Sequence, residues 1–158
     1  MTGVRDYLAQ GRPLVFDGAM GTCFAARSGR ARCGCEQANL DCPDEISAIH
    51  RAYLEAGCQA IKTNTFSLSS QMAQGEDPEE LLRAACRLAR DAAAPYGAYV
   101  FGDLGPVPQA HPDPGALYCR QAGLFLEEGI TCFLAETLSS VEGIEALARF
   151  LRERCPEA

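Results

Sequence analysis

Four polar residues in this sequence follow short apolar segments, each at nearly the same distance after a glycine. Carboxylate and hydroxyl groups bind small polar ligands when a fold brings them together. The four pairs, separated by six, six, six and seven residues, are Gly11 and Asp17, Gly57 and Thr63, Gly97 and Asp103, and Gly129 and Glu136. We therefore expect the chemistry of the protein at the ends of these four apolar segments.

Asp17 precedes a glycine-containing turn in which the backbone N–H groups of Gly18 and Ala19 are expected to be exposed. A carboxylate accepts hydrogen bonds from an ammonium group, and backbone N–H groups can receive a carboxylate. The pair suits a zwitterion, although an aspartate in a turn is equally typical of a structural role. The segment lacks the third glycine of a dinucleotide fingerprint and the Gly-Lys-Ser/Thr of a phosphate loop, which disfavours a nucleotide site.

Glu136 is a second carboxylate that we expect at the same cavity. The alternative is an ordinary acid at a strand end, solvated or paired with an arginine. The segment 63–66, Thr-Asn-Thr-Phe, offers hydroxyls, an amide and an aromatic ring as a wall for a small polar ligand with an apolar end. Strand alternation points Lys62 to the face opposite Ile61 and Thr63, where its charge needs a partner or water.

The elements that must position these residues are helices that end at glycines and run into strands. A glycine just past a helix end accepts the left-handed conformation that closes the last turn. Repeated units of this kind predict a parallel α/β sheet, in which ligands bind beyond the carboxyl ends of the strands. The expected strands are 14–17, 58–63, 98–103 and 130–135; helices are expected over 2–10 and around 43–54, 77–92, 117–125 and 139–151, and a long loop over 18–42.

Length and composition indicate one soluble globular domain over residues 1–158. The chain is 47% apolar and 22% charged, with a formal net charge of -7. It has no basic run, so we expect neither nucleic acid nor an anionic membrane as a partner. No window approaches the roughly 18 apolar residues of a membrane span, and residues 1–10 lack the apolar centre of a secretion signal. We expect a cytoplasmic protein.

Cysteine and histidine, the usual zinc ligands, are mostly expected in other roles. The nine cysteines are odd in number and irregularly spaced, which predicts reduced thiols. Cys33, Cys35 and Cys42 cluster in the polar loop, where they could hold a metal only with a fourth ligand. His50 lies in a predicted helix far from the strand ends, which favours a packing or surface role. Four other cysteines fall in predicted helices or strands and are expected in the core: Cys58, Cys86, Cys119 and Cys132.

Three segments, 15–22, 43–57 and 62–66, closely resemble the start of the homocysteine S-methyltransferase family. This family includes the homocysteine-binding module of cobalamin-dependent methionine synthase and betaine–homocysteine methyltransferase. The segments 102–106, Gly-Asp-Leu-Gly-Pro, and 134–137, Leu-Ala-Glu-Thr, are similar to its third and fourth strand ends. The resemblance extends over residues 14–151, nearly the whole chain.

The resemblance implies a (βα)8 barrel, homocysteine as substrate, and a zinc ion that binds the substrate sulfur. Metal coordination holds a thiol as the thiolate that attacks an activated methyl group. By resemblance, Asp17 and Gly18 bind the amino-acid end, Thr65 and Phe66 form the cavity wall, and Glu136 binds the ammonium. The motif at 62–66 usually begins with glutamate in the family, whereas this chain has a lysine there.

The chain departs from the family in length. A barrel of this type needs around 250 residues, and this chain supplies the first four of eight βα units. The family's zinc ligands are cysteines at later strand ends, including a Gly-Gly-Cys-Cys signature that this sequence lacks. We therefore expect no metal at the family site in this chain alone, and the residues here leave the methyl donor unknown.

Half a barrel leaves open sheet edges and an exposed apolar face. We expect a complementary C-terminal half-barrel or self-association to cover them. Three interpretations follow: the homocysteine-binding part of an enzyme, including half of a split enzyme; a non-catalytic amino-acid-binding or interaction module; or an unrelated α/β protein that binds another small acid.

Overall fold

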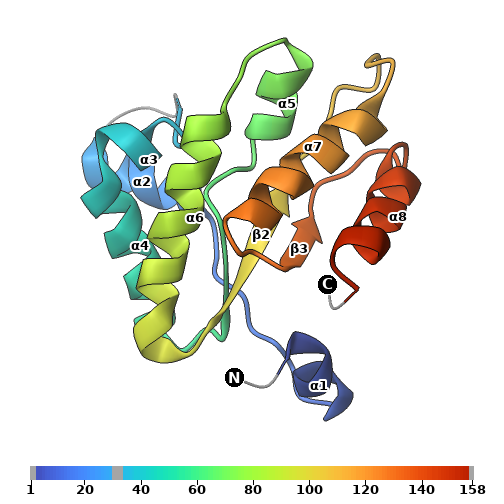
Figure 1. Ribbon diagram of the computed structural model, residues 1–158. Helices are drawn as coiled ribbons and strands as arrows, with labels where there is room; N and C mark the ends of the chain where they lie inside the picture. The colour runs from blue at the N-terminus through green and yellow to red at the C-terminus, as the bar shows by residue number, and fades with distance from the viewer. Residues whose placement is uncertain (1–2, 30–33, 157–158) are drawn as a thin grey trace.

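The computed structural model describes residues 3–29 and 34–156, and within them it is an α/β structure (Figure 1). The strands are β1 (Ala60–Lys62), β2 (Tyr99–Leu104) and β3 (Cys132–Ala135). The helices are α1 (Val4–Ala9), α2 (Met20–Ser28), α3 (Ala38–Asp41), α4 (Pro43–Glu55), α5 (Leu68–Ala73), α6 (Glu79–Ala93), α7 (Pro114–Glu127) and α8 (Ile144–Arg154), with a short 3-10 helix, η1 (Ala94–Tyr96). No helix in these ranges is long and apolar enough to cross a membrane.

The three strands form a parallel sheet in the order β1-β2-β3. The predicted first strand, 14–17, is wrong as a strand: within the described chain it makes a single parallel bridge, between Phe16 and Ala60. Asp17 N–H donates to the carbonyl of Ala60 at 2.9 Å, and Ala60 N–H donates to the carbonyl of Val15 at 3.2 Å. The segment therefore pairs with β1 on one side only, which is too little for a regular ladder.

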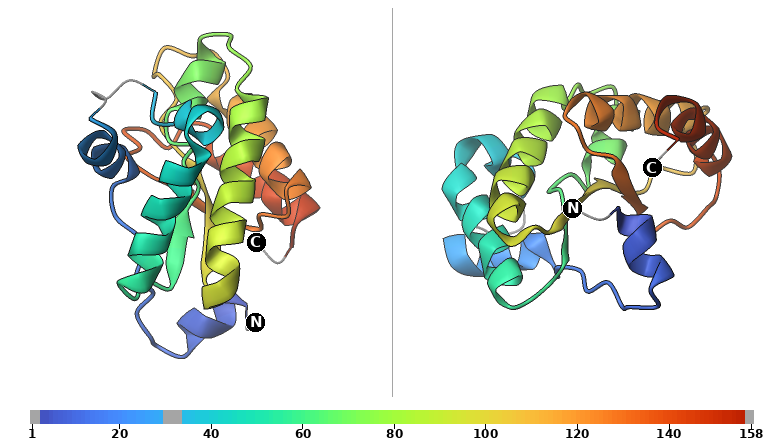
Figure 2. Two further views of the ribbon diagram at one scale, coloured as in Figure 1. Left: turned by 90° about the vertical axis from the view of Figure 1, so that its left-hand side faces the viewer. Right: turned by 60° about the horizontal axis from the view of Figure 1, so that its bottom comes forward.

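Helices α4, α6 and α7 cover one face of the sheet, and α8 packs on α7 (Figures 1 and 2). Parallel strands need crossover connections, and helices supply them here between β1 and β2 and between β2 and β3. Ile61 and Leu104 point to this face and are fully buried. A Cβ on Gly102 would lie 3.0 Å from the Phe125 ring, so the glycine lets α7 approach the sheet closely.

The four glycines of the sequence pattern all have left-handed backbone conformations. Their φ values run from 59° to 101°, at Gly11, Gly57, Gly97 and Gly129. Side chains other than glycine rarely adopt this conformation. The predicted rule that a helix ends at a glycine and is followed by a strand is therefore confirmed after α4, η1 and α7, whereas after α1 and Gly11 the chain makes only the single bridge at Phe16.

Two other predictions about the elements were wrong. The expected loop over 18–42 contains α2 and α3, because Phe24 is buried against Ile46 and Ile49 of α4, a tertiary contact that the many glycines and cysteines obscured. The helix expected from residue 139 begins only at Ile144, because Gly143 precedes it with a left-handed φ of 81°. The structure also contains α5, which the sequence pattern did not indicate.

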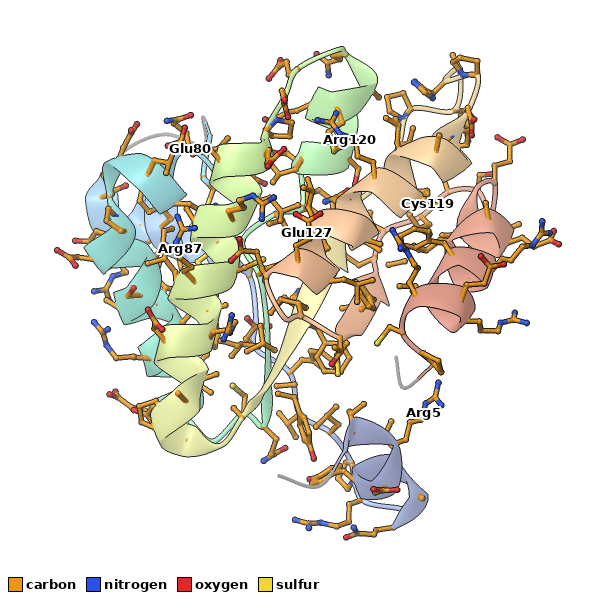
Figure 3. All side chains as sticks on the ribbon, in the orientation of Figure 1. Arg5, Glu80, Arg87, Cys119, Arg120 and Glu127 are labelled. Atoms are coloured by element: carbon orange, nitrogen blue, oxygen red, sulfur yellow. The ribbon has the colours of Figure 1, made fainter. Side chains whose placement is uncertain are left out.

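Helix α1 lies at the end of the sheet opposite the predicted site. The rings of Tyr7 on α1 and Tyr99 at the start of β2 meet edge to face, with centroids 5.8 Å apart. Arg5 points from α1 toward the C-terminal segment, where its guanidinium donates to the carbonyl of Pro156 at 3.4 Å (Figure 3). The outer faces of the helices carry charged side chains, such as Arg87, Arg120 and Glu127 in Figure 3.

Candidate functional site

A cavity of about 340 Å³ lies at the carboxyl ends of the strands. All five residues predicted for the site line it: Asp17, Gly18, Thr65, Phe66 and Glu136. The other two polar strand ends of the sequence pattern, Thr63 and Asp103, line it as well. The four polar residues of the sequence pattern thus meet at one cavity although they are far apart in the sequence, because the carboxyl ends of parallel strands lie at the same edge of a sheet.

Asp17 lines the cavity and is held by the backbone of β1 through one of its two carboxylate oxygens. Its Oδ2 accepts a hydrogen bond from the Lys62 backbone N–H at 3.1 Å, whereas Oδ1 is buried and has no partner in the described chain. Burial raises the pKa of Asp17 to about 6, against the lowering effects of the Lys62 N–H and ammonium. A buried acceptor without a donor is costly, so Oδ1 is suited to a donor from a ligand.

Glu136 forms an ion pair with Lys62 across the cavity. The Lys62 Nζ lies 3.0 Å from Glu136 Oε2, and the side chains are 20% and 29% exposed. Lys62 lies on the sheet face opposite Ile61, as strand alternation predicts, and this is the face that it shares with its register partner Phe101 on β2. The alternative partner considered for Glu136, an arginine, is therefore wrong: the partner is Lys62, and it points into the cavity.

Asp103 on β2 is the most deeply buried acid of the cavity, with 3% of its surface exposed. Its Oδ1 also has no hydrogen-bond partner in the described chain. Burial, and secondarily the negative charge of Glu136, raises the pKa of Asp103 to about 8. At neutral pH this carboxyl group therefore retains its proton in most molecules, so that it can donate as well as accept a hydrogen bond.

Thr65 shapes the wall of the cavity but its hydroxyl is already used. Its Oγ1 donates to the carbonyl of Asp103 at 2.8 Å and lies 2.8 Å from Thr63 Oγ1. Thr63 Oγ1 in turn accepts the Asp103 N–H at 3.0 Å. The two threonines therefore fix the backbone of β2 beside Asp103, and the exposed ring of Phe66 completes this side of the cavity.

Glu36 lines the cavity without having been predicted from the sequence, and Asn64, an expected part of the wall, makes contacts that were not predicted. Glu36 is 8% exposed, and its Oε1 accepts the Ser67 N–H at 2.8 Å. Asn64 donates to the carbonyl of Cys35 and to Asn39 Oδ1, both at 2.8 Å. These contacts hold the segment before α3 over the strand ends. No spacing in the sequence signals them, because they join residues about 30 positions apart.

The described residues do not form a metal site. No group of three or more cysteine, histidine, aspartate or glutamate residues in residues 3–29 and 34–156 could hold a metal ion. Of the three cysteines considered, Cys33 lies outside the described residues. Cys35 Sγ donates to Asn64 Oδ1 at 3.4 Å, and burial raises the pKa of this thiol to about 11, which disfavours the thiolate that a metal binds.

His50 lies away from the cavity, inside α4. It is fully buried, which confirms the predicted packing role. Neither ring nitrogen has a hydrogen-bond partner in the described chain, and burial lowers the pKa of His50 to about 4. The imidazole is therefore neutral at physiological pH.

Comparison with known proteins agrees with this arrangement. The family model described as homocysteine S-methyltransferase matches residues 14–157. Methionine synthase of Mycobacterium tuberculosis is 35% identical over 120 residues, which cover 66% of this chain and 10% of that protein. Betaine–homocysteine S-methyltransferase 1 of Danio rerio is 25% identical over 164 residues, which cover 95% of this chain and 40% of that protein.

The fold also matches a solved structure. The metallated form of the homocysteine methyltransferase MmuM from Escherichia coli superposes with a TM-score of 0.78 over 96% of this chain and 63% of that chain, at 24% identity. The likeness concerns the fold, and the chain spans 40% or less of the two curated relatives above. The family match over residues 14–157 excludes the unrelated α/β protein considered from the sequence, and the chain belongs to the homocysteine S-methyltransferase family.

Proposed function

We propose that this chain binds homocysteine in the cavity at the strand ends and serves as the homocysteine-binding part of an S-methyltransferase. The observation that carries the proposal is that Asp17 and Glu136 line the same cavity. Asp17 follows the segment that pairs with β1 at one edge of the sheet, and Glu136 follows β3 at the other edge. Family relatives named for homocysteine methyl transfer support the choice of ligand.

Each part of the amino acid has a matching group in the cavity. The ammonium is placed between Asp17 Oδ1, which lacks a donor, and the carboxylate of Glu136. The turn at Gly18 provides room beside Asp17. The side chain of homocysteine, which carries the thiol, runs along the wall made by Thr65 and Phe66. An ammonium held by two carboxylate groups makes charge-assisted hydrogen bonds, which are among the stronger polar contacts.

The chemistry of the thiol needs groups that the described residues do not supply. Zinc, when bound in this family, lowers the pKa of a thiol from its ordinary value near 8.5 so that it reacts as the thiolate. No set of side chains in the described ranges fits such an ion. We therefore assign to this chain the binding and orientation of the amino-acid end and no step of methyl transfer, and the methyl donor stays unknown.

We also propose that the chain forms the first four βα units of a barrel and that another polypeptide segment, in the same or a second molecule, completes it. Within the described residues β3 pairs with β2 only. The face of the sheet opposite the helices carries Phe16 and Leu134, which are both partly exposed. Sedimentation of the isolated chain tests this proposal: without the completing segment the chain is expected to associate with itself or to be poorly folded, and a stable, well-folded monomer would contradict the need for completion.

A non-catalytic amino-acid-binding module is the second candidate. The lack of a metal group among the described residues favours it over an enzyme that acts alone. Both candidates use the same cavity, so they differ in what zinc and further polypeptide add rather than in the binding residues.

Isothermal titration calorimetry with L-homocysteine, with and without zinc, tests the proposal. Binding that is independent of zinc is expected for this chain. The absence of binding under both conditions would refute a homocysteine site. Methyl transfer that appears only when a polypeptide with the Gly-Gly-Cys-Cys motif is added would identify half of a split enzyme, whereas binding without activity in that mixture would identify the module.

A further inference from the structure

Lys62 is the only lysine of the chain, and the other 13 basic residues are arginines. It is also the only cationic side chain among the described residues that line the cavity. A lysine ammonium is a compact charge with three donors on a flexible stem, whereas the arginine guanidinium is a broad planar group. The cavity therefore contains the one basic side chain in this sequence that can turn a point charge toward different acceptors.

The ammonium of Lys62 has capacity beyond its bond to Glu136. Of its three N–H groups, one suffices for the contact with Glu136 Oε2 at 3.0 Å. The side chain is 20% exposed, so it can reach a ligand without a change in the sheet. Interactions with Glu136, Asp17 and Asp103 raise the pKa of Lys62 despite its partial burial, which keeps the group charged at neutral pH.

The acidic residues that line the cavity are Asp17, Glu36 and Glu136, together with Asp103, which keeps its proton at neutral pH in most molecules. Such a cavity attracts the ammonium of an amino acid but repels its carboxylate. An α-amino acid carries its ammonium and carboxylate groups on one carbon atom, so a cation close to the acid that holds the ammonium is well placed to bind the carboxylate. Lys62 and Glu136 provide such a pair of opposite charges.

We propose that Lys62 is a specificity-determining residue that selects ligands with an α-carboxylate next to the ammonium. On binding, the ion pair exchanges partners: Lys62 binds the carboxylate of the amino acid, and Glu136 binds its ammonium. The closed Lys62–Glu136 pair is then the ligand-free state of the site. This inference rests on the proposed function, because it takes an amino acid as the ligand of the cavity.

Binding by three ligands tests the exchange. L-homocysteine carries both charges, 3-aminopropane-1-thiol lacks the carboxylate, and 4-mercaptobutanoic acid lacks the ammonium. Calorimetry is carried out on the wild type, Lys62→Met, Lys62→Arg and, as a surface control, Arg149→Met, whose side chain is 71% exposed. Lys62→Met is expected to reduce the preference for homocysteine over 3-aminopropane-1-thiol by about 10- to 100-fold, the size of a charge-assisted hydrogen bond.

Lys62→Arg is expected to restore part of the preference, and Arg149→Met to leave it unchanged. If wild-type protein binds homocysteine and Lys62→Met keeps the same preference, the carboxylate is bound elsewhere, for example by the N–H groups of Gly18 and Ala19. That result overturns this inference and leaves the proposed function intact. Wild-type protein that binds no homocysteine overturns both.

A measurement on the wild type covers the case in which Lys62→Met does not fold. Protein labelled with ¹³C-lysine gives one lysine side-chain Cε signal, because the chain has one lysine. Addition of 4-mercaptobutanoic acid, which has no ammonium for Glu136, is expected to shift this signal in a saturable way. A signal that does not move at saturating homocysteine and 4-mercaptobutanoic acid would overturn the exchange.

Discussion

Gly18 lies directly against the hydroxyl group of Tyr53 on α4. A Cβ atom on residue 18 would be 2.7 Å from the Tyr53 oxygen and 3.0 Å from two carbons of the ring. The Tyr53 hydroxyl also donates to the carbonyl of Ala19 at 3.2 Å, which holds the ring in place. The turn after Asp17 therefore needs a glycine for space, and this packing sets the position of Asp17 at the cavity.

Gly18→Ala is expected to lower the free energy of unfolding by about 1–3 kcal/mol, the usual cost of overpacking. Urea denaturation measures the change. Gly123→Ala is the matched control, because its Cβ would be 3.7 Å from the nearest atom and alanine favours a helix interior, so this variant is expected to be as stable as the wild type or more stable. Equal stability of Gly18→Ala and the wild type would contradict the account of this turn.

Asp103 is expected to make the protein less stable as the pH rises toward 8. In the unfolded chain the carboxyl ionises near its ordinary pKa of 3.8, whereas burial in the folded protein raises this pKa to about 8. The folded state therefore binds more protons between these values, and the stabilisation present below pH 4 is lost progressively up to pH 8. For one such group the slope is at most about 1.4 kcal/mol per pH unit.

Comparison of the wild type with Asp103→Asn between pH 6.5 and 7.5 isolates this effect, because Asp17 and His50 are present in both proteins and contribute to both profiles. Urea denaturation across this range is expected to show falling stability for the wild type and a flatter profile for Asp103→Asn, which resembles the protonated acid. Identical slopes for the two proteins would show that Asp103 is ionised in the folded state.

His50 is expected to have the opposite effect at lower pH. Its pKa is about 4 in the folded protein and near 6.5 in the unfolded chain, so the unfolded state binds more protons between these values. The wild type therefore loses stability from this group as the pH falls through 6.5 toward 4. His50→Leu removes two nitrogens without partners and this pH dependence.

The stability of His50→Leu relative to the wild type is measured by urea denaturation at pH 7 and pH 5. We expect the difference to shift in favour of the variant by about 1–2 kcal/mol at pH 5, because one pKa unit corresponds to about 1.4 kcal/mol. A difference that is the same at both pH values would mean that His50 is protonated in the folded protein or has a partner there.

The positions of the strand ends could be predicted from the sequence because their signal is local. A glycine ends a helix by its own backbone preference, and the following apolar run is short enough to fix where the polar residue appears. Asp17, Thr63, Asp103 and Glu136 therefore meet at one cavity as expected. The domain boundaries 1–158 remain a prediction, as does a cytoplasmic location.

The charge pairing in the cavity could not be predicted because its signal is not local. Lys62 and Glu136 are 74 residues apart, and only the register of three strands brings them within 3.0 Å. The hydroxyl groups that bind the backbone of Asp103 likewise come from residues about 40 positions away, Thr63 and Thr65. Phe24 is a similar case, since its burial against α4 makes a helix of a segment that local composition describes as a loop.

The binding role of Glu136 is the central claim, and the affinity of Glu136→Gln for L-homocysteine tests it most directly. Glu145→Gln serves as the control, because the Glu145 side chain is 90% exposed and lies outside the cavity. Calorimetry is expected to show affinity about 10- to 100-fold weaker for Glu136→Gln, since a charge-assisted hydrogen bond to the ammonium is lost, and unchanged affinity for Glu145→Gln. Equal affinities of Glu136→Gln and the wild type would contradict the account.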